Sequence, residues 1–401
     1  FPSRDIIYLM AELLVAPEKA EITAEGCTKT AYDMAMGTSQ MLGCLTERLQ
    51  AISADATLTC FGQEFNPETY AIAKADMLIK GGNASGMKYG DTLSDDAFSG
   101  YEFDYIISNP PFGIDWKREK TQVESEAKRG FDGRFGPGLP AISDGQMLFL
   151  LNGVRKLKTG SGRMAIIQNG SSLFTGDAGS GASEIRRYVI EGDLVEAIIQ
   201  MPTDLFYNTG ISTYIWVLTK GKTMQRSGRV QLIDASKCYV KRRKNIGNKR
   251  VDLDDACIRL ILRAYEGFAD ETCEDNGLIV ESKVFDNRFF GFTKVTVETA
   301  QTDEHGKPIL KKGKKQPVKG ASDTEIIPLS EDIDAYMEKN VLPYNPLAYI
   351  DHAKDKIGYE VPFTRLFYQF VPPTPSDEIF AEIKELEAEE SALMKELFGN
   401  A

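Results

Sequence analysis

A short polar and aromatic motif, Asn109-Pro110-Pro111-Phe112, directly follows an apolar stretch that ends at Ser108. The apolar stretch has the β-branched residues of a buried strand, and neither proline can donate a hydrogen bond to a continuing strand. The prolines therefore stiffen the backbone just past the strand and hold Asn109 and Phe112 at its carboxyl end. In open α/β sheets, ligands bind at that edge. Taken alone, the motif is also compatible with a plain loop that carries a surface phenylalanine.

Three carboxylates precede this motif, and each closes a predicted strand: Asp33, Glu64 and Asp91. Gly37 follows the first strand and allows the backbone to turn close to a ligand. Because this turn lacks the G-x-G-x-x-G phosphate fingerprint, a phosphate-free nucleoside is favoured over a dinucleotide. Glu64 could accept both hydroxyls of a ribose, and Asp91 could accept from the exocyclic amine of an adenine. Each acid alone could equally be an ordinary turn or strand end. Together with Asn109 they predict one site at four strand ends.

The composition excludes several other kinds of site. The chain has 401 residues, of which 42% are hydrophobic and 26% charged, as in a soluble globular protein of two or three domains. It has two histidines and six cysteines without a C-x-x-C pair, which disfavours metal sites, histidine triads and disulfide scaffolds and favours a reducing cytoplasm. No apolar run approaches the ~18–20 residues that span a bilayer. Because the net charge is −12, binding to nucleic acid would require a partner or local basic patches.

Alternating strands and helices must position these side chains. We expect strands at 28–36, 57–65, 86–91, 103–108, 163–169, 194–201, 212–220 and 229–236, and helices at 5–14, 39–50, 67–81, 144–158 and 182–191. This alternation predicts an α/β fold with a parallel sheet. Residues 113–142 form a long Gly-, Pro- and charge-rich loop beside the expected site, as a lid would. The polar stretch 300–324 reads as an exposed hairpin or a disordered insertion.

Several longer segments, in order, resemble the modification (M) subunit of type I restriction–modification systems. They are 61–81, 90–98, 103–113 (FDYIISNPPFG) and, most specifically, 169–220 (NGSSLFTGDAGSGASEIRRYVIEGD through STYIWVLTK). The resemblance covers roughly residues 1–300. It implies an N6-adenine DNA methyltransferase with a Rossmann-like S-adenosylmethionine-dependent methyltransferase sheet, flanking helices and a C-terminal helical tail. It also implies that the helical N-terminal domain of the family is missing from this chain.

The resemblance assigns roles to the predicted site residues. S-adenosyl-L-methionine is the implied cofactor, with Asp33, Ala35, Gly37 and Thr38 at its methionine end, Glu64 at the ribose and Asp91 at the adenine. Asn109 and the Pro110 carbonyl, beside Pro111, would accept the two N–H groups of the target amine, and Phe112 would stack on the base. Base flipping is implied because the target atom lies inside a duplex.

The implied partners are double-stranded DNA and a specificity (S) subunit. A second M subunit and a restriction (R) subunit could join them. The resemblance implies no membrane partner. The implied domains are a catalytic domain at 1–300, a polar insertion and extension at 301–370, and a linker with a partner-binding helix at 371–401.

The first cofactor motif departs from the family pattern D-P-x-x-G-T-G-G. Met34 replaces the proline, and Ser39 and Gln40 replace the last two glycines. Their side chains could crowd the methionine end of the cofactor or add contacts to it. Phe1-Pro2-Ser3-Arg4 likewise replaces an aromatic-Thr-Pro-Arg motif. An alternative function follows from these departures: a non-catalytic, DNA-binding scaffold subunit with a degenerate cofactor motif.

Two further segments suggest macromolecular contacts. Seven of the fourteen residues at 237–250 are Lys or Arg and none is acidic, which predicts a DNA-backbone contact through Lys241, Arg242, Arg243 and Lys244. A solvated basic surface is the alternative. The helix expected at 377–398 carries an apolar heptad stripe after a Pro-rich linker at 371–378, which predicts docking on a partner subunit. Folding back onto its own domain is the alternative.

Overall fold

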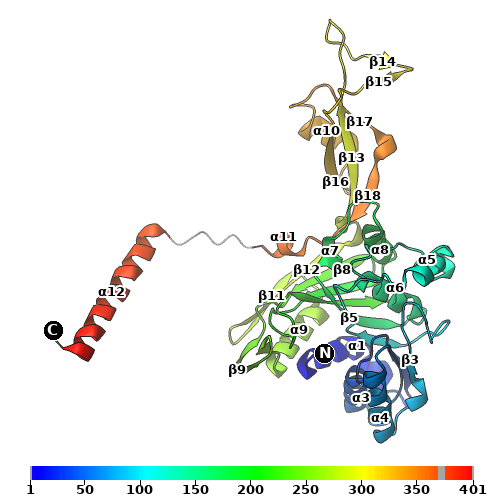
Figure 1. The fold of residues 1–401 in the computed structure, drawn as a ribbon, viewed down its shortest axis with the longest axis vertical. Helices are drawn as coiled ribbons and strands as arrows, with labels where there is room; N and C mark the ends of the chain where they lie inside the picture. Colours follow the sequence, from blue (N-terminus) through cyan, green and yellow to red (C-terminus); the bar gives the residue numbers. More distant parts are fainter. Residues whose placement is uncertain (1, 369–374, 400–401) are drawn as a thin grey trace. The chain divides into compact units, whose positions relative to one another are not determined.

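A ten-stranded mixed sheet forms the centre of the chain in the computed structural model, which describes residues 2–368 and 375–399 (Figure 1). Its strand order is β11-β12-β8-β6-β7-β5-β4-β1-β2-β3. The strands are β1 Thr28–Asp33, β2 Thr57–Glu64, β3 Met87–Tyr89, β4 Tyr105–Ser108, β5 Arg163–Asn169, β6 Val195–Gln200, β7 Thr213–Thr219, β8 Arg229–Asp234, β11 Glu271–Asp275 and β12 Leu278–Asp286. The predicted strands are all present, and their ends differ from the prediction by at most three residues.

The strand order reverses between β1 and β4. From β1 the chain passes to β2 and β3 on one side, and from β4 to β5 on the other, and these strands are all parallel. Such a reversal opens a crevice at the carboxyl ends of the two middle strands. The expected parallel sheet is confirmed for these five strands, but the sheet as a whole is mixed, because β7 runs antiparallel to both β5 and β6. Residues 201–212, all of them described, contain no helix between β6 and β7, so the chain returns in the opposite direction.

Helices cover both faces of this sheet (Figure 1). α4 shows how the local sequence sets a boundary: Pro67 occupies its first turn, and the Asn66 side chain accepts hydrogen bonds from the backbone N–H groups of Glu68 and Thr69, both at 3.0 Å. The helices are α1 Arg4–Val15, α2 Lys19–Ile22, α3 Gln40–Ile52, α4 Pro67–Ile79, α5 Lys120–Ala127, α6 Gln146–Lys156, α7 Ser171–Phe174, α8 Gly181–Glu191 and α9 Asp255–Gly267.

Residues 113–142 differ from the lid-like loop that we expected. They contain α5, and Arg134 beyond it is 7% exposed. Arg134 forms an ion pair with Glu126 of α5 and donates to the carbonyls of Thr92 and Leu93 at 2.6 and 3.0 Å. A buried charge needs such partners, and these contacts tie the segment to the body of the protein.

A second, four-stranded sheet follows the first. It contains β13 Gly291–Thr299, β16 Asp323–Pro328, β17 Ala348–Ile350 and β18 Lys356–Tyr359, with α10 Ile333–Asn340 packed on it. It begins ten residues before the boundary expected at 301. Within it, β14 Leu310–Lys311 and β15 Lys314–Lys315 form an exposed hairpin, one of the two structures expected for 300–324. Arg186 of α8 donates to the Tyr359 carbonyl at 2.6 Å and joins the two sheets.

A C-terminal unit, 364–401, is separate from the unit formed by 1–363. It contains most of α11 Phe363–Phe367 and all of α12 Ser376–Phe398, which confirms the helix expected at 377–398. Residues 371–374 of the expected linker and Phe1 of the opening motif lie outside the described residues. Within the described part of the chain, no helix combines the length and apolar character needed to cross a bilayer.

Candidate active site

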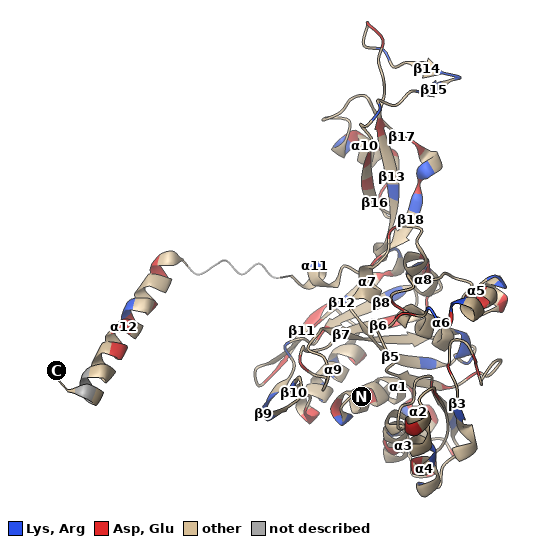
Figure 2. Ribbon diagram, viewed as in Figure 1, with Lys and Arg blue, Asp and Glu red and all other residues tan. Residues whose placement is uncertain are grey.

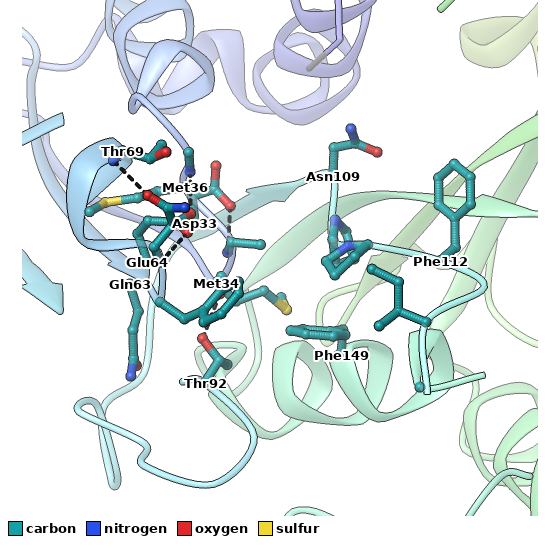
Figure 3. Close-up of a pocket in the computed structure, with 18 of the residues that line it drawn as sticks. Asp33, Met34, Met36, Gln63, Glu64, Thr69, Thr92, Asn109, Phe112 and Phe149 are labelled. Atoms are coloured by element: carbon teal, nitrogen blue, oxygen red, sulfur yellow. Dashed lines mark hydrogen bonds between the residues drawn. The ribbon is translucent and has the colours of Figure 1, made fainter. Parts of the chain in front are cut away.

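A pocket of about 1090 Å³ lies at the carboxyl ends of β1, β2 and β4, in the crevice beside the strand-order reversal. Every cofactor and catalytic residue predicted from the sequence lines it: Asp33, Ala35, Gly37, Thr38, Glu64, Asp91, Asn109, Pro110, Pro111 and Phe112. Figure 3 shows that Asp33, Glu64 and Thr92 lie on one side of the pocket and Asn109, Phe112 and Phe149 on the other. The pocket therefore has an acidic half and a half walled by an amide and aromatic rings.

Asp33 is fully buried at the end of β1. Its Oδ1 accepts from the Ser108 hydroxyl at 2.7 Å and from the Ala35 backbone N–H at 3.1 Å, whereas the buried Oδ2 has no hydrogen-bond partner among the described residues. Burial raises the pKa of Asp33 to about 7, the two hydrogen bonds oppose that shift, and the nearby negative charge of Glu64 adds to it. The second oxygen is thus an unused acceptor that would gain from a cationic ligand.

Of the three residues that depart from the family pattern in the first motif, Met34 and Gln40 line the pocket and Ser39 does not. Gly37 has φ 54° and Ser39 φ 62°, so both occupy the left-handed region. Ser39 is buried and does not line the pocket, whereas Gln40 at the start of α3 does. Met36 fills the space above Gly62, where an added Cβ would lie 2.4 Å from its sulfur. The substitution at position 39 therefore puts no side chain into the pocket.

Glu64 and Asp91 end the next two strand regions and organise the backbone beside them. The two oxygens of Glu64 accept from the N–H groups of Gly37 and Asn66 at 3.0 and 2.8 Å. Asp91 Oδ1 accepts from the N–H groups of Leu93 and Ser94 at 2.8 and 2.9 Å. Each carboxylate oxygen has two lone pairs, so both acids retain acceptor capacity toward the pocket.

Asn109 has a buried Oδ1 that no described residue hydrogen-bonds. Pro110 is buried behind it and Phe112 is half-buried at the rim. An unpaired buried acceptor costs about 1–3 kcal/mol, and a ligand that donates a hydrogen bond would remove that cost. The Asn109 oxygen is therefore placed to accept a hydrogen bond from a ligand in the aromatic half of the pocket.

Sequence reasoning missed two residues of that half. Phe149 lies in α6, where its apolar neighbours made it look like part of the core. Asn169 ends β5 just as Asn109 follows β4, so the strand-end rule could have found it. A loop that includes Phe206, Asn208 and Thr209 closes another side of the pocket.

The predicted basic residues do not line the pocket but lie on a hairpin that contacts its rim. β9 Val240–Ile246 and β10 Lys249–Asp252 form this hairpin, and its Asn248 N–H donates to the Tyr207 carbonyl at 2.9 Å. Arg242 is bound to Asp252 at 2.6 Å. Three residues remain exposed with no ion pair among the described residues: Lys241, Arg243 and Lys244. Nor do the described residues contain a cluster of acidic, His or Cys side chains arranged to hold a metal ion.

Comparison with known proteins places the chain in a family. A family described as N-6 DNA Methylase matches residues 1–304. The chain belongs to the N-6 DNA methylase family. It is 28% identical over 267 residues to the type I restriction enzyme MjaIX methylase subunit of Methanocaldococcus jannaschii, covering 66% of this chain and 44% of that protein. It is 27% identical over 321 residues to the HindI methylase subunit of Haemophilus influenzae, covering 78% and 66%. The chain thus spans about half to two thirds of these relatives.

A solved structure extends the likeness to the fold. The crystal structure of a type I restriction-modification system methyltransferase subunit from Streptococcus thermophilus superposes with a TM-score of 0.58 at 26% identity, covering 72% of this chain and 56% of that one. The resemblance to type I methyltransferase subunits and the predicted methyltransferase sheet are thereby confirmed for this chain.

Proposed function

We propose that this chain transfers a methyl group from S-adenosyl-L-methionine to the N6 amine of adenine in DNA, as the modification subunit of a type I restriction–modification complex. The observation that carries the proposal is the buried, unpartnered Asn109 oxygen in the same pocket as the three strand-end acids. Family membership supports the reaction class, and the named relatives support the type I assignment.

The acidic half of the pocket fits the cofactor. The unpaired Asp33 Oδ2 is an acceptor for the ammonium of the methionine end, and Ala35, Gly37 and Thr38 form the backbone wall beside it. Glu64 and Asp91 retain acceptor capacity for ribose hydroxyls and an adenine amine. When bound, the cofactor supplies a methyl group on a sulfonium sulfur, which is an excellent leaving group.

The amide half fits the target base. An adenine amine is a poor nucleophile because its lone pair is delocalised into the ring. The Asn109 oxygen and the Pro110 carbonyl would accept its two N–H groups, draw the nitrogen toward tetrahedral geometry and localise that pair. The two prolines restrict the backbone that presents both acceptors, so the catalysis rests on positioning and on stabilising charge that develops on nitrogen. Phe112 would stack on the flipped base, and no covalent enzyme intermediate is needed.

Hairpin β9–β10 is the proposed DNA-backbone contact. Figure 2 shows basic residues on this hairpin, and the hydrogen bonds from it to Asp204 and Tyr207 place it beside the loop that closes the pocket. Phosphates next to a flipped nucleotide would meet its exposed side chains. Of the four predicted residues, Arg242 is already neutralised by Asp252, so Lys241, Arg243 and Lys244 carry the proposed contact.

The proposal includes an S subunit that selects the DNA sequence, because the named relatives are methylase subunits of type I restriction enzymes, and it allows a second M subunit and an R subunit. It also includes a cytoplasmic location, which the six unpaired cysteines support. The scaffold alternative predicts no binding of S-adenosylmethionine by the assembled complex. The fit of Asp33 and the absence of Ser39 from the pocket favour the enzyme.

The decisive experiment is transfer of labelled methyl groups to DNA. The protein is co-expressed with the neighbouring specificity gene. The purified complex is then incubated with labelled S-adenosylmethionine and with genomic DNA from a strain that lacks this modification system. We expect label in N6-methyladenine after nucleoside digestion. Label in cytosine overturns the proposed reaction, and so does the absence of label when the cofactor is bound. Absence of cofactor binding by the assembled complex favours the scaffold alternative.

A further inference from the structure

Asn169 lies one strand away from the Asn109 motif and further out along the sheet edge. β4 and β5 are parallel, with Ser108 opposite Ile166, so Asn109 is level with Ile167 and Asn169 lies two positions beyond it. Both asparagines line the pocket. At about 3.3 Å per residue along a strand, this offset leaves room for a planar base between the two amides.

The Asn169 amide is held in one orientation. Its Oδ1 accepts from the Ser171 backbone N–H at 3.0 Å and from Gln146 Nε2 at 2.7 Å. The Gln146 amide is itself oriented, because its Oε1 accepts the Asn169 backbone N–H at 3.1 Å and its Nε2 donates to Asp144 at 2.6 Å. Since backbone N–H groups can only donate, these contacts settle which end of each amide is oxygen.

The amino group of Asn169 is the end left for the pocket. Its Nδ2 has no hydrogen-bond partner among the described residues. Unlike the Asn109 oxygen, this nitrogen is not fully buried, so a ligand in the pocket can reach it. The pocket therefore presents an acceptor, the Asn109 oxygen, and an N–H donor on the neighbouring strand.

We propose that Asn169 contributes to selection of an amine-bearing target base by donating a hydrogen bond from Nδ2 to a ring nitrogen beside the exocyclic amine. The inference rests on the proposed function. In adenine, N1 and N7 lie on either side of the exocyclic amine and both accept, so Asn109 and Asn169 together match an amine beside a ring acceptor. Guanine mismatches the pair, because it presents an acceptor where adenine has its amine and its N1 carries a hydrogen. Cytosine, whose amine lies beside the acceptor N3, matches the pair, so the two asparagines select for an amine beside a ring acceptor.

The test compares Asn169→Ala and Asn169→Asp with wild type in the complex with its S subunit. Asn169→Asp keeps the acceptor for Ser171 and Gln146 but replaces the donor with a second oxygen. Asn276→Asp, the same change in the exposed turn between β11 and β12, is the control. The substrates are unmethylated duplexes that contain the sequence which the complex modifies. They carry adenine, 1-deazaadenine or 7-deazaadenine at the target position.

We expect wild type to lose about 10- to 100-fold in kcat/KM on one of the two deaza substrates, the range of a lost buried hydrogen bond. On adenine, Asn169→Ala should lower kcat/KM by a similar factor, and its kcat/KM should be the same for adenine and for that deaza substrate. Asn169→Asp should lower kcat/KM on adenine by at least as much. Cofactor affinity should stay within about twofold of wild type, as expected of a base contact.

The outcomes separate the two claims. If wild type fails to methylate adenine, the proposed function fails, and this inference with it. If wild type methylates adenine but the Asn169 variants discriminate both deaza substrates as strongly as wild type does, only the role of Asn169 is overturned. Equal losses in Asn276→Asp and Asn169→Asp would show a general charge effect and would also overturn it.

Discussion

The Asn109 side chain holds a polar atom that the fold alone does not satisfy. Asn109→Ala removes that acceptor, so we expect methyl transfer to fall by at least about 100-fold, the cost of removing one donor or acceptor to a developing charge. Cofactor affinity should change little, since the acidic half of the pocket is untouched. Stability should not fall, because the variant removes an unpaired buried oxygen. Single-turnover methylation, cofactor titration and chemical denaturation measure the rate, the cofactor affinity and the stability. Near-wild-type turnover would contradict the role of Asn109 as an acceptor for the target amine.

At the residue scale we also expect Asp33 to make binding of S-adenosylmethionine depend on pH. Its pKa is raised to about 7 by burial, so the folded protein keeps a proton that the unfolded chain loses near 3.8. Stability without cofactor therefore contains a contribution that is lost as pH rises from about 4 to about 7. A cationic ligand favours the ionised carboxylate, so affinity for S-adenosylmethionine should rise with pH up to about 7 and then level off.

Calorimetry in buffers of different ionisation enthalpy measures this linkage. Below pH 7 the wild type should release a proton on binding, and Asp33→Asn should bind more weakly with a flatter pH profile. Identical pH profiles for the two proteins would show that Asp33 does not face the cation.

At the scale of elements, Arg134 joins three parts of the chain: the 113–142 segment, the turn after Asp91, and α6 through Asn152. Arg134→Met leaves Glu126 without its main buried partner, which costs about 3–5 kcal/mol. The hydrogen bonds to Thr92 and Leu93 are also removed, so cofactor affinity should fall.

Arg129→Met is a matched control for Arg134→Met. Arg129 also contacts Glu126, at 3.5 Å, but its side chain is 60% exposed, so its removal should cost under about 1 kcal/mol. Denaturant unfolding and cofactor titration compare the two variants. Equal small losses of stability would mean that the segment does not depend on the Arg134 contacts.

Hairpin β9–β10 should dominate the salt dependence of DNA binding. The triple variant Lys241→Gln/Arg243→Gln/Lys244→Gln should weaken binding by the complex and reduce the slope of log K against log salt by about one for each phosphate that is no longer neutralised. Arg242→Gln should have a smaller effect, because Asp252 already neutralises it.

A matched control for this triple variant lies on the other exposed hairpin, as Lys311→Gln/Lys312→Gln/Lys314→Gln. It removes the same number of positive charges at a distance from the pocket rim, so the salt slope should stay close to that of wild type. An unchanged slope in the β9–β10 variant, or equal changes in both variants, excludes the proposed DNA contact.

At the scale of the whole molecule, the C-terminal unit has an apolar stripe that no described residue of that unit covers. Its members are Ile379, Ile383, Leu386, Leu393 and Leu397, each 45% to 73% exposed. Their heptad spacing fits a long helix of the S subunit, which the resemblance implies as the partner. A lone helix of this length is marginal in water, so a partner would supply most of its stability.

Deleting 377–401 should therefore leave a folded chain that binds cofactor but no longer co-purifies with the S subunit. Glu382→Gln/Glu389→Gln, off the apolar stripe, is the control that should still co-purify. A truncated chain that forms the complex at full affinity would show that the stripe belongs to the chain's own domain.

The sequence by itself determined the elements and the chemistry at their ends. The strand expected at 103–108 contains β-branched residues and ends where the two prolines begin, because a proline cannot donate a strand hydrogen bond. Helix α4 begins at Asn66-Pro67, because the Asn66 side chain caps its first N–H groups. Because strand ends of a parallel sheet meet at one edge, Asp33, Glu64, Asp91 and Asn109 could be assigned to one site before any coordinates.

Tertiary structure decided what depends on partners distant in sequence. The buried pair of Arg134 and Glu126, the packing of Met36 over Gly62 and the network that orients Asn169 all join residues whose proximity no local pattern records. The antiparallel β7 and the second sheet were missed for the same reason, since pairing across long connections has no local signature. The free energy of a buried charge or amide is set by which groups surround it, and only the folded chain specifies those groups.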